Sequence, residues 1–311
     1  MQFGAAFWIQ RTDWPSLRDA ALAAEAAGFD AVWLDDHLLS DEGDWTSPKL
    51  EGWTALAALA PLTASVRLGH LVAANTFRNP GLTAKLATTL DHLTGGRFTL
   101  GIGGGWFERE HDAFGLDFGS GFGERLDRLE EAVSLIRRLL DGERVTHDGR
   151  FYRMRDAVCQ PRPIQPRLPI LIGGSGRTKT LRTTARYADL WNGYGAPERI
   201  AEVSGWLRER CEEERRPFES IARSVMLDVV IRDSPAAAAA ADDELLAGQG
   251  ISRRRTSDEP DWNPLIAGPP ALVADRIRPY VGLGVRQVMW IFRAPWDRQT
   301  IDRLPEVRAL L

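Results

Sequence analysis

The residues best suited to proton transfer in this sequence are His37 and the two carboxylates that precede it, Asp35 and Asp36. An imidazole titrates near neutral pH and a neighbouring carboxylate tunes its pKa, so the group could move protons or hydrogen-bond a cofactor ring. The alternative is a structural histidine bonded to nearby backbone, which is the commoner role of a lone histidine. We expect His37 and Asp36 to carry the acid–base chemistry.

A glycine-rich turn, Gly-Gly-Ser-Gly, occupies residues 173–176 and leads into Arg177 and Lys179. Free backbone N–H groups at the start of a helix, together with the helix dipole and two cations, form an anion site, and phosphate is the usual anion. A plain surface turn with solvated charges is the alternative. Because the turn follows an apolar strand, the sequence favours phosphate.

Three consecutive glycines, Gly103, Gly104 and Gly105, follow a short alternating apolar strand at residues 98–102. Glycine lets the backbone take a positive φ and lets a bulky group approach closely, at a loss of conformational entropy. The alternative is a tight strand exit, for which one glycine would usually suffice. We therefore expect a ligand floor at the carboxyl end of this strand.

Aromatic residues are the other candidate ligand contacts, because the chain holds 11 tryptophans. Several follow predicted strands, and aromatic walls suit a flat heterocycle, although core packing explains any single tryptophan equally well. We expect Trp8, Trp45 and Trp262 to contact the substrate. The histidines show no metal-ligand spacing, so we expect no metal and rank a metal-dependent hydrolase last among the alternatives.

Composition limits the class of protein and its partners. The 311 residues are 44% hydrophobic and 26% charged, with a formal net charge of −4, which fits a globular protein and gives no basic footprint for nucleic acid. The two cysteines are far apart, the first residues do not resemble a signal peptide, and no apolar run could cross a bilayer. We expect a cytoplasmic protein that acts on a small molecule, without nucleic-acid or membrane partners.

The elements that must position these residues alternate along the chain. Apolar runs predict strands at 3–9, 31–34, 66–74, 98–102, 170–172, 190–192, 224–231 and 287–292, with helical patterns between them. Eight such units predict an α/β (β/α)8 TIM barrel, whose working residues lie at the carboxyl ends of the strands. Neither glycine loop fits the fingerprint of an open doubly wound sheet. We expect one domain over 1–311, with insertion segments at 142–169 and 248–264.

Several collinear segments together resemble a known family. Residues 34–37, 50–53, 67–69, 75–80, 91–97, 101–106 and 169–174 read LDDH, LEGW, RLG, NTFRNP, DHLTGGR, GIGGGW and PILIGG. They are similar to the luciferase-like monooxygenase superfamily, and most like its branch that uses the deazaflavin coenzyme F420. This resemblance covers nearly the whole chain and is far more specific than any single motif.

The resemblance implies a TIM barrel that binds a flavin or deazaflavin at the carboxyl ends of its strands. It places His37 and Asp36 by the redox-active ring, a strand-end bulge with a non-proline cis peptide behind the ring, and the phosphate at the glycine turn. It implies a homodimer as a common assembly. The implied cofactor contacts are Leu71, Val72, Ala74, Asn75, Gly103, Gly104, Trp106, Arg109, Gly173, Gly174, Ser175 and Gly176.

One departure from the family bears on the substrate. Deazaflavin dehydrogenases of sugar phosphates and alcohols carry a glutamate proton donor directly after the glycines, where this chain has Trp106, and Glu108 lies two positions on. The resemblance implies an F420-dependent oxidoreductase that transfers a hydride to or from a small organic substrate. An FMN-dependent monooxygenase and a non-catalytic flavin-binding protein are the alternatives.

Overall fold

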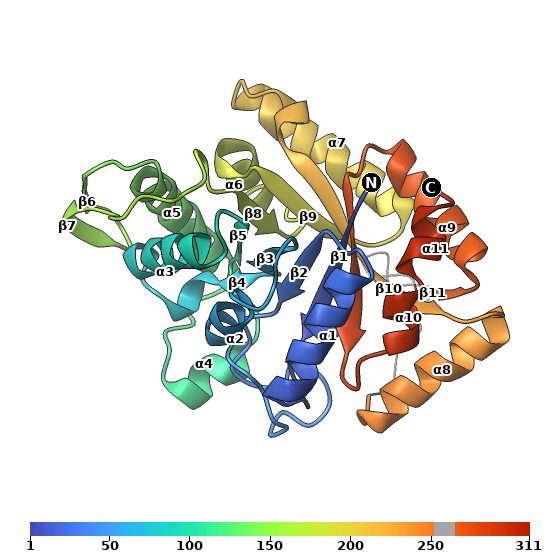
Figure 1. Ribbon diagram of the computed structural model, residues 1–311. Helices are drawn as coiled ribbons and strands as arrows, with labels where there is room; N and C mark the ends of the chain where they lie inside the picture. The colour runs from blue at the N-terminus through green and yellow to red at the C-terminus, as the bar shows by residue number, and fades with distance from the viewer. Residues whose placement is uncertain (252–264) are drawn as a thin grey trace.

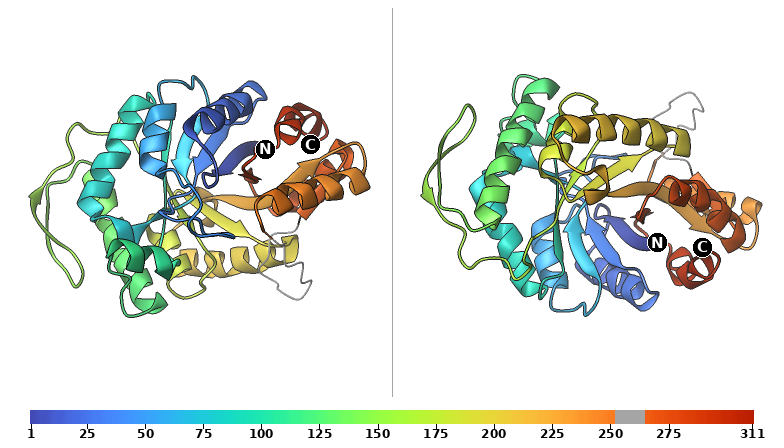
Figure 2. Two further views of the ribbon diagram at one scale, coloured as in Figure 1. Left: turned by 90° about the horizontal axis from the view of Figure 1, so that it is seen from below. Right: turned by 90° about the horizontal axis from the view of Figure 1, so that it is seen from above.

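In the computed structural model, which describes residues 1–251 and 265–311, parallel strands close into a barrel ringed by helices (Figures 1 and 2). The barrel closes where the strand at residues 190–194 pairs in parallel with residues 222–226 of the next strand along the chain. The predicted TIM barrel is therefore confirmed. In order around the barrel, its strands are β1 (Gln2–Trp8), β2 (Ala31–Leu34), β3 (Arg67–His70), β5 (Phe98–Gly103), β8 (Ile170–Gly173), β9 (Leu190–Tyr194), β10 (Ala222–Ile231) and β12 (Gln287–Arg293).

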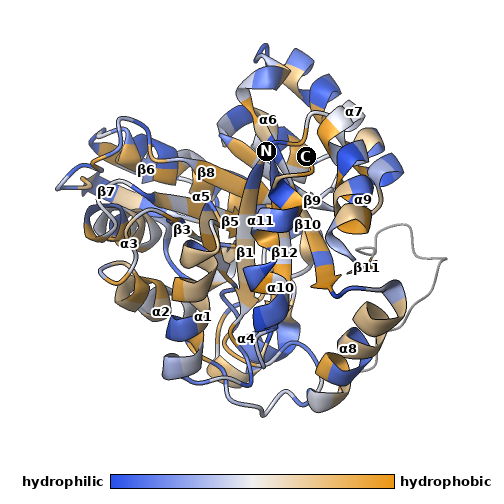
Figure 3. Cartoon of the chain, turned by 45° about the vertical axis from the view of Figure 1, so that its right-hand side comes forward, coloured by the Kyte–Doolittle hydropathy of each residue, from blue (hydrophilic) through white to orange (hydrophobic). Residues whose placement is uncertain are grey.

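Helices follow most of the strands and cover the outside of the barrel, as the end-on views in Figure 2 show. The strands are mostly apolar and the helices are two-faced (Figure 3), the pattern expected of a parallel sheet buried on both sides. The helices are α1 (Trp14–Ala26), α2 (Gly52–Leu59), α3 (Pro80–Leu93), α4 (Glu108–Phe114), α5 (Phe122–Leu140), α6 (Thr180–Tyr187), α7 (Pro197–Glu213), α8 (Pro235–Gly248), α9 (Pro270–Gly282), α10 (Arg298–Asp302) and α11 (Leu304–Arg308), with short 3-10 turns at η1 (Asn75–Phe77) and η2 (Phe218–Ser220).

A buried tryptophan belongs to the inner cluster of the barrel and packs against glycines of the two neighbouring strands. Trp33 on β2 is 2% exposed, and a Cβ on Gly4 or Gly69 would lie 2.7 Å or 2.6 Å from its ring. Neither glycine therefore tolerates a side chain. Because this ring closes the interior between β1, β2 and β3, the carboxyl ends of the strands remain as the place for a ligand.

The third predicted strand is the main departure within the barrel. Instead of one strand over 66–74, β3 ends at His70 and a two-residue strand, β4 (Ala73–Ala74), pairs with β5. Between them the Leu71–Val72 peptide bond is cis. This is the bulge with a non-proline cis peptide that the family resemblance implied.

Other segments refine the predicted elements. The short helix α4 and the strand β11 (Leu265–Gly268), which pairs with β10, were not predicted, and the last predicted helix is divided into α10 and α11. The hairpin β6 (Val145–Asp148) and β7 (Arg153–Ala157) lies outside the barrel sheet, within the predicted insertion 142–169. In the other predicted insertion, 252–264 lie outside the described residues.

Candidate active site

The imidazole of His37 is held by a carboxylate that the sequence interpretation did not select. His37 follows β2, and its Nδ1 lies 3.0 Å and 3.2 Å from the two carboxylate oxygens of Glu110 on α4. The same carboxylate accepts a hydrogen bond of 2.9 Å from the backbone N–H of Leu38. Glu110 is only 1% exposed. The end of β2 is thus tied to α4, and the orientation of the ring is fixed.

Charge decides the protonation state of His37. Burial by itself lowers the pKa of the imidazole, but the hydrogen bond with Glu110 and the charges of Asp41, Asp35 and Glu110 raise the pKa to about 9. His37 is therefore an imidazolium at neutral pH, and its Nδ1–H donates to Glu110. A histidine in this state can release a proton or hydrogen-bond an electron-rich oxygen or nitrogen.

The other side of the imidazolium faces a second carboxylate. Nε2 of His37 lies 3.7 Å from Oδ2 of Asp41, whose side chain is 9% exposed. The nearby Asp35 is buried, pairs with the ammonium of Lys49, and accepts a hydrogen bond of 2.9 Å from the backbone N–H of Ile9. Burial opposes ionisation of Asp35, but Lys49 and His37 lower its pKa below the ordinary value. Asp35 is thus a fixed anion of the framework.

Asp36 points away from His37 and holds the neighbouring bulge. Its carboxylate makes hydrogen bonds of 2.6 Å and 3.0 Å with the guanidinium of Arg78 and accepts another of 3.0 Å from the backbone N–H of Ala74. The side chain is 1% exposed. Because its oxygens are committed to Arg78 and Ala74, we interpret Asp36 as a positioning residue rather than a proton donor.

The bulge brings several predicted cofactor contacts together. Ala74 lies beside Gly103 in the β4–β5 register, and Val72 is placed so that a Cβ on Gly103 or Gly173 would lie 2.9 Å or 3.2 Å from its side chain. These glycines therefore let Val72 lie at the barrel mouth between β5 and β8. Asn75 is buried and donates to the hydroxyl of Tyr152 at 3.0 Å.

The remaining predicted glycines also meet neighbouring side chains. A Cβ on Gly104 would lie 3.1 Å from Leu126, and one on Gly105, where φ is +78°, would lie 2.6 Å from the hydroxyl of Thr76. The sequence predicted that a ligand packs closely against these glycines, and in the structure protein side chains already do so. The three glycines thus have a structural reason of their own, and their contact with a ligand stays a prediction.

Apolar and aromatic groups form a floor and one wall at this end of the barrel. Trp8, Val72 and Met226 are partly buried and pack on the inner cluster that includes Leu71 and Trp33. Trp106 is 58% exposed, and its ring meets that of His37 edge-on, with centroids 5.3 Å apart. An exposed tryptophan beside an imidazolium and above an apolar floor suits a flat ring that is polar at one edge.

The glycine turn after β8 offers backbone donors. Among the residues that the structure describes, none accepts a hydrogen bond from the backbone N–H of Ser175, Gly176 or Arg177. Gly174 has φ of +115°, and a Cβ on Gly176 would lie 2.8 Å from the hydroxyl of Thr180 at the start of α6. Free N–H groups at the amino end of a helix fit a phosphate group.

The two cations of the predicted phosphate site are directed elsewhere. Arg177 pairs with Glu209 at 3.2 Å, and Lys179 pairs with Asp127 at 2.6 Å. These pairs are partly exposed, and such pairs contribute little, so a phosphate could compete for the cations. Backbone donors are thus the stronger part of this candidate site.

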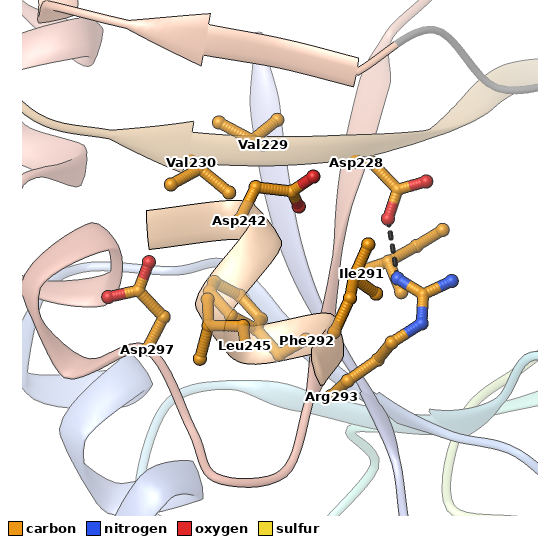
Figure 4. Close-up of a pocket in the computed structure, with 10 residues that line it drawn as sticks. Asp228, Val229, Val230, Asp242, Leu245, Ile291, Phe292, Arg293 and Asp297 are labelled. Atoms are coloured by element: carbon orange, nitrogen blue, oxygen red, sulfur yellow. Dashed lines mark hydrogen bonds and ion pairs between the residues drawn. The ribbon is translucent and has the colours of Figure 1, made fainter. Parts of the chain in front are cut away.

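A second cluster of charges lies at the carboxyl end of β12. The guanidinium of Arg293, at the end of β12 beside Trp8, contacts Asp228 at 2.6 Å (Figure 4) and Glu42 at 2.8 Å. These carboxylates raise the pKa of Arg293 against the effect of burial. A neighbouring pocket between β10, β12 and α8 is lined by Asp228, Val229, Val230, Asp242, Leu245, Leu246, Ile291, Phe292, Arg293 and Asp297.

Two predicted contacts, Arg109 and Trp45, pair with each other rather than with His37. Arg109 lies over the ring of Trp45, with the guanidinium carbon 4.9 Å from the ring centroid, and both side chains are exposed. Trp262 lies outside the described residues. Within the ranges 1–251 and 265–311, no group of three His, Cys, Asp or Glu residues is arranged to hold a metal ion.

Sequence reasoning missed Glu110, Asp41 and Arg78. Glu110 lies four residues after Trp106 on a helix of seven residues without an apolar period, and Arg78 lies inside the NTFRNP segment without an evident role. A signal for Glu110 existed, because acidic residues favour the first turn of a helix.

No helix of the described chain is long and apolar enough to span a membrane.

The fold and site define a TIM barrel with an imidazolium, an apolar floor and a candidate anion turn at its carboxyl end. The sequence profile of the luciferase-like monooxygenase family matches residues 1–287. The chain therefore belongs to this family, as the resemblance predicted, and the prediction of an oxidoreductase is confirmed.

Similar proteins include F420-dependent enzymes and a monooxygenase. The chain is 33% identical to the F420-dependent glucose-6-phosphate dehydrogenase of Nakamurella multipartita, over 95% of this chain and 93% of that protein. The coenzyme F420-dependent tetrahydromethanopterin reductase from Methanopyrus kandleri superimposes with a TM-score of 0.77 at 20% identity, covering 97% of this chain and 96% of that one. A long-chain alkane monooxygenase superimposes with a TM-score of 0.81 at 17% identity, covering 99% and 90%. These two structures bear on the fold alone.

Proposed function

We propose that this protein is a coenzyme F420-dependent oxidoreductase that transfers a hydride between the deazaflavin and a small organic substrate. The observation that carries the proposal is the His37–Glu110 pair at the carboxyl end of the barrel, beside the Leu71–Val72 bulge. The family membership and the F420-dependent relative that matches over nearly the whole chain support the choice of cofactor. When bound, coenzyme F420 supplies or accepts the hydride at C5 of its ring.

Different residues would hold the ring and the phosphate of this cofactor. Val72 and Ala74 would support the ring, with Leu71 and Asn75 fixing the bulge from below and Asp36 fixing it from β2. The backbone of the turn 173–176 would hold the phosphate with the free N–H groups of Ser175 and Gly176. The imidazolium of His37 would face the polar edge of the ring or the oxygen of the substrate, where it stabilises developing negative charge.

The walls of the site indicate the kind of substrate. Trp8, Met226 and Trp106 present apolar surface, while Arg293 is already neutralised by Glu42 and Asp228. An unsaturated or aromatic molecule with one carbonyl group fits this lining better than a sugar phosphate does. We therefore propose a substrate that differs from the glucose 6-phosphate in the name of the relative from Nakamurella.

Titration of the purified protein with oxidised coenzyme F420 and separately with FMN, followed by tryptophan quenching, tests the cofactor. We expect the deazaflavin to bind at least about 10-fold more tightly than FMN, a difference of about 1.4 kcal/mol. Preference for FMN, together with oxygen consumption in the presence of reduced FMN, would move the assignment to a monooxygenase. Failure to bind either cofactor would contradict the proposal.

A matched pair of variants tests the phosphate turn. Ser175→Asp adds a negative charge beside the free N–H groups, whereas Ser175→Asn adds a side chain of the same size without charge. We expect the aspartate to weaken F420 binding about 10-fold and the asparagine to change it about twofold or less, because a like charge repels the phosphate. Equal effects of the two variants would show that the turn does not bind an anion.

A further inference from the structure

Asp41 is a carboxyl group beside His37 that the mechanism above does not use. Its Oδ2 faces Nε2 of His37 at 3.7 Å, whereas Nδ1 on the other side of the ring is bound to Glu110. Its Oδ1 is buried and has no hydrogen-bond partner among the described residues. A buried carboxyl oxygen without a partner is costly, so it indicates a place where a further polar group binds.

The loop that carries Asp41 is fixed rather than free to turn away. Its backbone N–H donates to Oε1 of Gln10 at 3.2 Å, and the hydroxyl of Ser40 donates to the same oxygen at 2.9 Å. The next residue, Glu42, is held by two hydrogen bonds from Arg293, of 2.8 Å and 3.0 Å. Contacts with the ends of β1 and β12 therefore set the position of Asp41 relative to His37.

Charges of both signs surround Asp41. The cations are His37 and Lys49, and the anions are Asp35 and Glu42. Burial raises the pKa of Asp41, and the two cations offset this effect only in part. Asp41 therefore accepts a proton more readily than an ordinary aspartate does, so it could take a proton from His37 and pass it on.

We propose that Asp41 is a catalytic acid–base residue that exchanges a proton directly with the substrate, while His37 returns that proton to it. This proposal rests on the F420-dependent hydride transfer proposed above. Its geometric basis is the unpartnered oxygen of Asp41 and the 3.7 Å approach of Asp41 to Nε2 of His37. The role is that of the glutamate which the family resemblance led us to expect where this chain has Trp106.

The proton and hydride balance in either direction. In a reduction, Asp41 first takes a proton from Nε2–H of His37. The conjugated carbonyl substrate would gain a hydride at its electrophilic carbon from the bound deazaflavin, and Asp41 gives its proton to the atom that takes up the negative charge. The solvent then restores the proton of His37 through its 17% exposed side chain. In an oxidation each transfer runs in reverse, and the substrate loses one hydride and one proton.

Asp41→Asn tests the proposal against Asp44→Asn, a change of the same kind at an exposed carboxylate of the same loop that is bonded to Thr46. The assay is the oxidation of reduced F420 with cyclohex-2-en-1-one as the probe. We expect Asp41→Asn to lower turnover roughly 30-fold or more, Asp41→Glu to restore part of it, and Asp44→Asn to leave it unchanged. The Kd for F420 should stay within about twofold of the wild-type value in all three, because Asp41 is proposed to act on the substrate.

A second measurement does not depend on turnover. Carboxyl 13C NMR of the cofactor-free protein, assigned by difference from Asp41→Asn, follows the ionisation of Asp41. We expect Asp41 to titrate at a higher pH than an ordinary aspartate, and titration at or below the ordinary value overturns the proposal. Turnover of Asp41→Asn within about threefold of the wild type also overturns it. If the wild type does not bind F420, the proposed function is refuted. That result is distinguishable from a failure of the Asp41 proposal, in which F420 binds but Asp41→Asn keeps its turnover.

Discussion

Asp36 and His37 are adjacent in the sequence but belong to two different charge clusters. The oxygens of Asp36 are committed to Arg78 and to the backbone of Ala74, on the side of the bulge. His37 faces Glu110 with one nitrogen and leaves the other without a hydrogen bond to a described residue, 3.7 Å from Asp41. In the Asp36 cluster the carboxylate oxygens are hydrogen-bonded and hold the backbone of the bulge. In the His37 cluster one nitrogen of the imidazolium stays available for proton exchange.

The role of a buried charge depends on whether its polar atoms are already hydrogen-bonded. A carboxylate whose oxygens are all satisfied contributes to position, because any proton it accepted would break its ion pair. An imidazolium with one open N–H can exchange its proton without loss of its anchor. We therefore expect substitutions in the Asp36 cluster to change stability first, and substitutions in the His37 cluster to change catalysis first.

Replacement of His37 should give the largest effect on catalysis. His37→Asn keeps a polar side chain of similar reach but removes the titratable proton, and we expect hydride transfer to slow roughly 10²- to 10³-fold, the usual contribution of a general acid or base. Single-turnover oxidation of reduced F420 measures this rate. Unfolding by urea is measured alongside, and because the His37–Glu110 pair also stabilises the fold we expect a loss of about 2–3 kcal/mol at neutral pH, less than that expected for Asp36→Asn. A rate within threefold of wild type would assign His37 a merely structural role.

Replacement of Asp36 should give the largest effect on stability. Asp36→Asn leaves the largely buried guanidinium of Arg78 with the partly exposed Glu51 as its remaining carboxylate partner among the described residues, and breaking a buried ion pair costs about 3–5 kcal/mol. Urea unfolding measures the loss. The control is Asp19→Asn, which breaks an exposed pair with Arg18 and should cost less than about 1 kcal/mol. Equal losses would contradict the assignment of a positioning role to Asp36.

The barrel could be predicted because its signals are local. The strands 31–34 and 98–102 are runs of apolar residues next to glycine or acidic turns, and eight such runs in alternation with helices leave few other folds. The helix α3 was predicted with its observed bounds, because Asn79 and Pro80 mark its start. The division of β3 from β4 could not be read from residue types, and only the family resemblance indicated the bulge.

The site was less predictable because it is made by contacts distant in sequence. Glu110 meets His37 across 73 residues, and Arg293 meets Glu42 across 251. No local pattern distinguishes Glu110 from Glu108, although only Glu110 is buried. The glycines after β5 show another limit of residue patterns, since neighbouring side chains such as Val72 and Leu126 also require small residues there, whether or not a ligand does.

A substitution of Glu110 tests how much this carboxylate raises the pKa of His37. Glu110→Gln removes the hydrogen-bonded anion, so the pKa of His37 should fall from about 9 by more than one unit, as 15N NMR of the imidazole would measure. Because the folded-state pKa lies above the ordinary 6.5, this group stabilises the fold below pH 6.5 and loses that contribution as the pH rises through 9.

The same change has a counterpart in the dependence of stability on pH. We expect the wild type to lose on the order of 2–3 kcal/mol of unfolding free energy between pH 6 and 9.5 from this group, and Glu110→Gln to lose less than half as much. The matched control is Glu108→Gln, an exposed carboxylate on the same helix. An unchanged His37 pKa in Glu110→Gln would show that another anion holds the imidazolium.

The smallest effect should come from the far side of the bulge, where Asn75 donates to the hydroxyl of Tyr152. Tyr152→Phe removes this one hydrogen bond and keeps the ring, so we expect a loss of about 1 kcal/mol in unfolding free energy. The bulge keeps its bond from Ala74 to Asp36, and the Kd for F420 should therefore rise only about twofold. A much larger loss of affinity would mean that Tyr152, rather than Asp36, is the main support of the bulge, and the contrast between the two clusters would have to be redrawn around it.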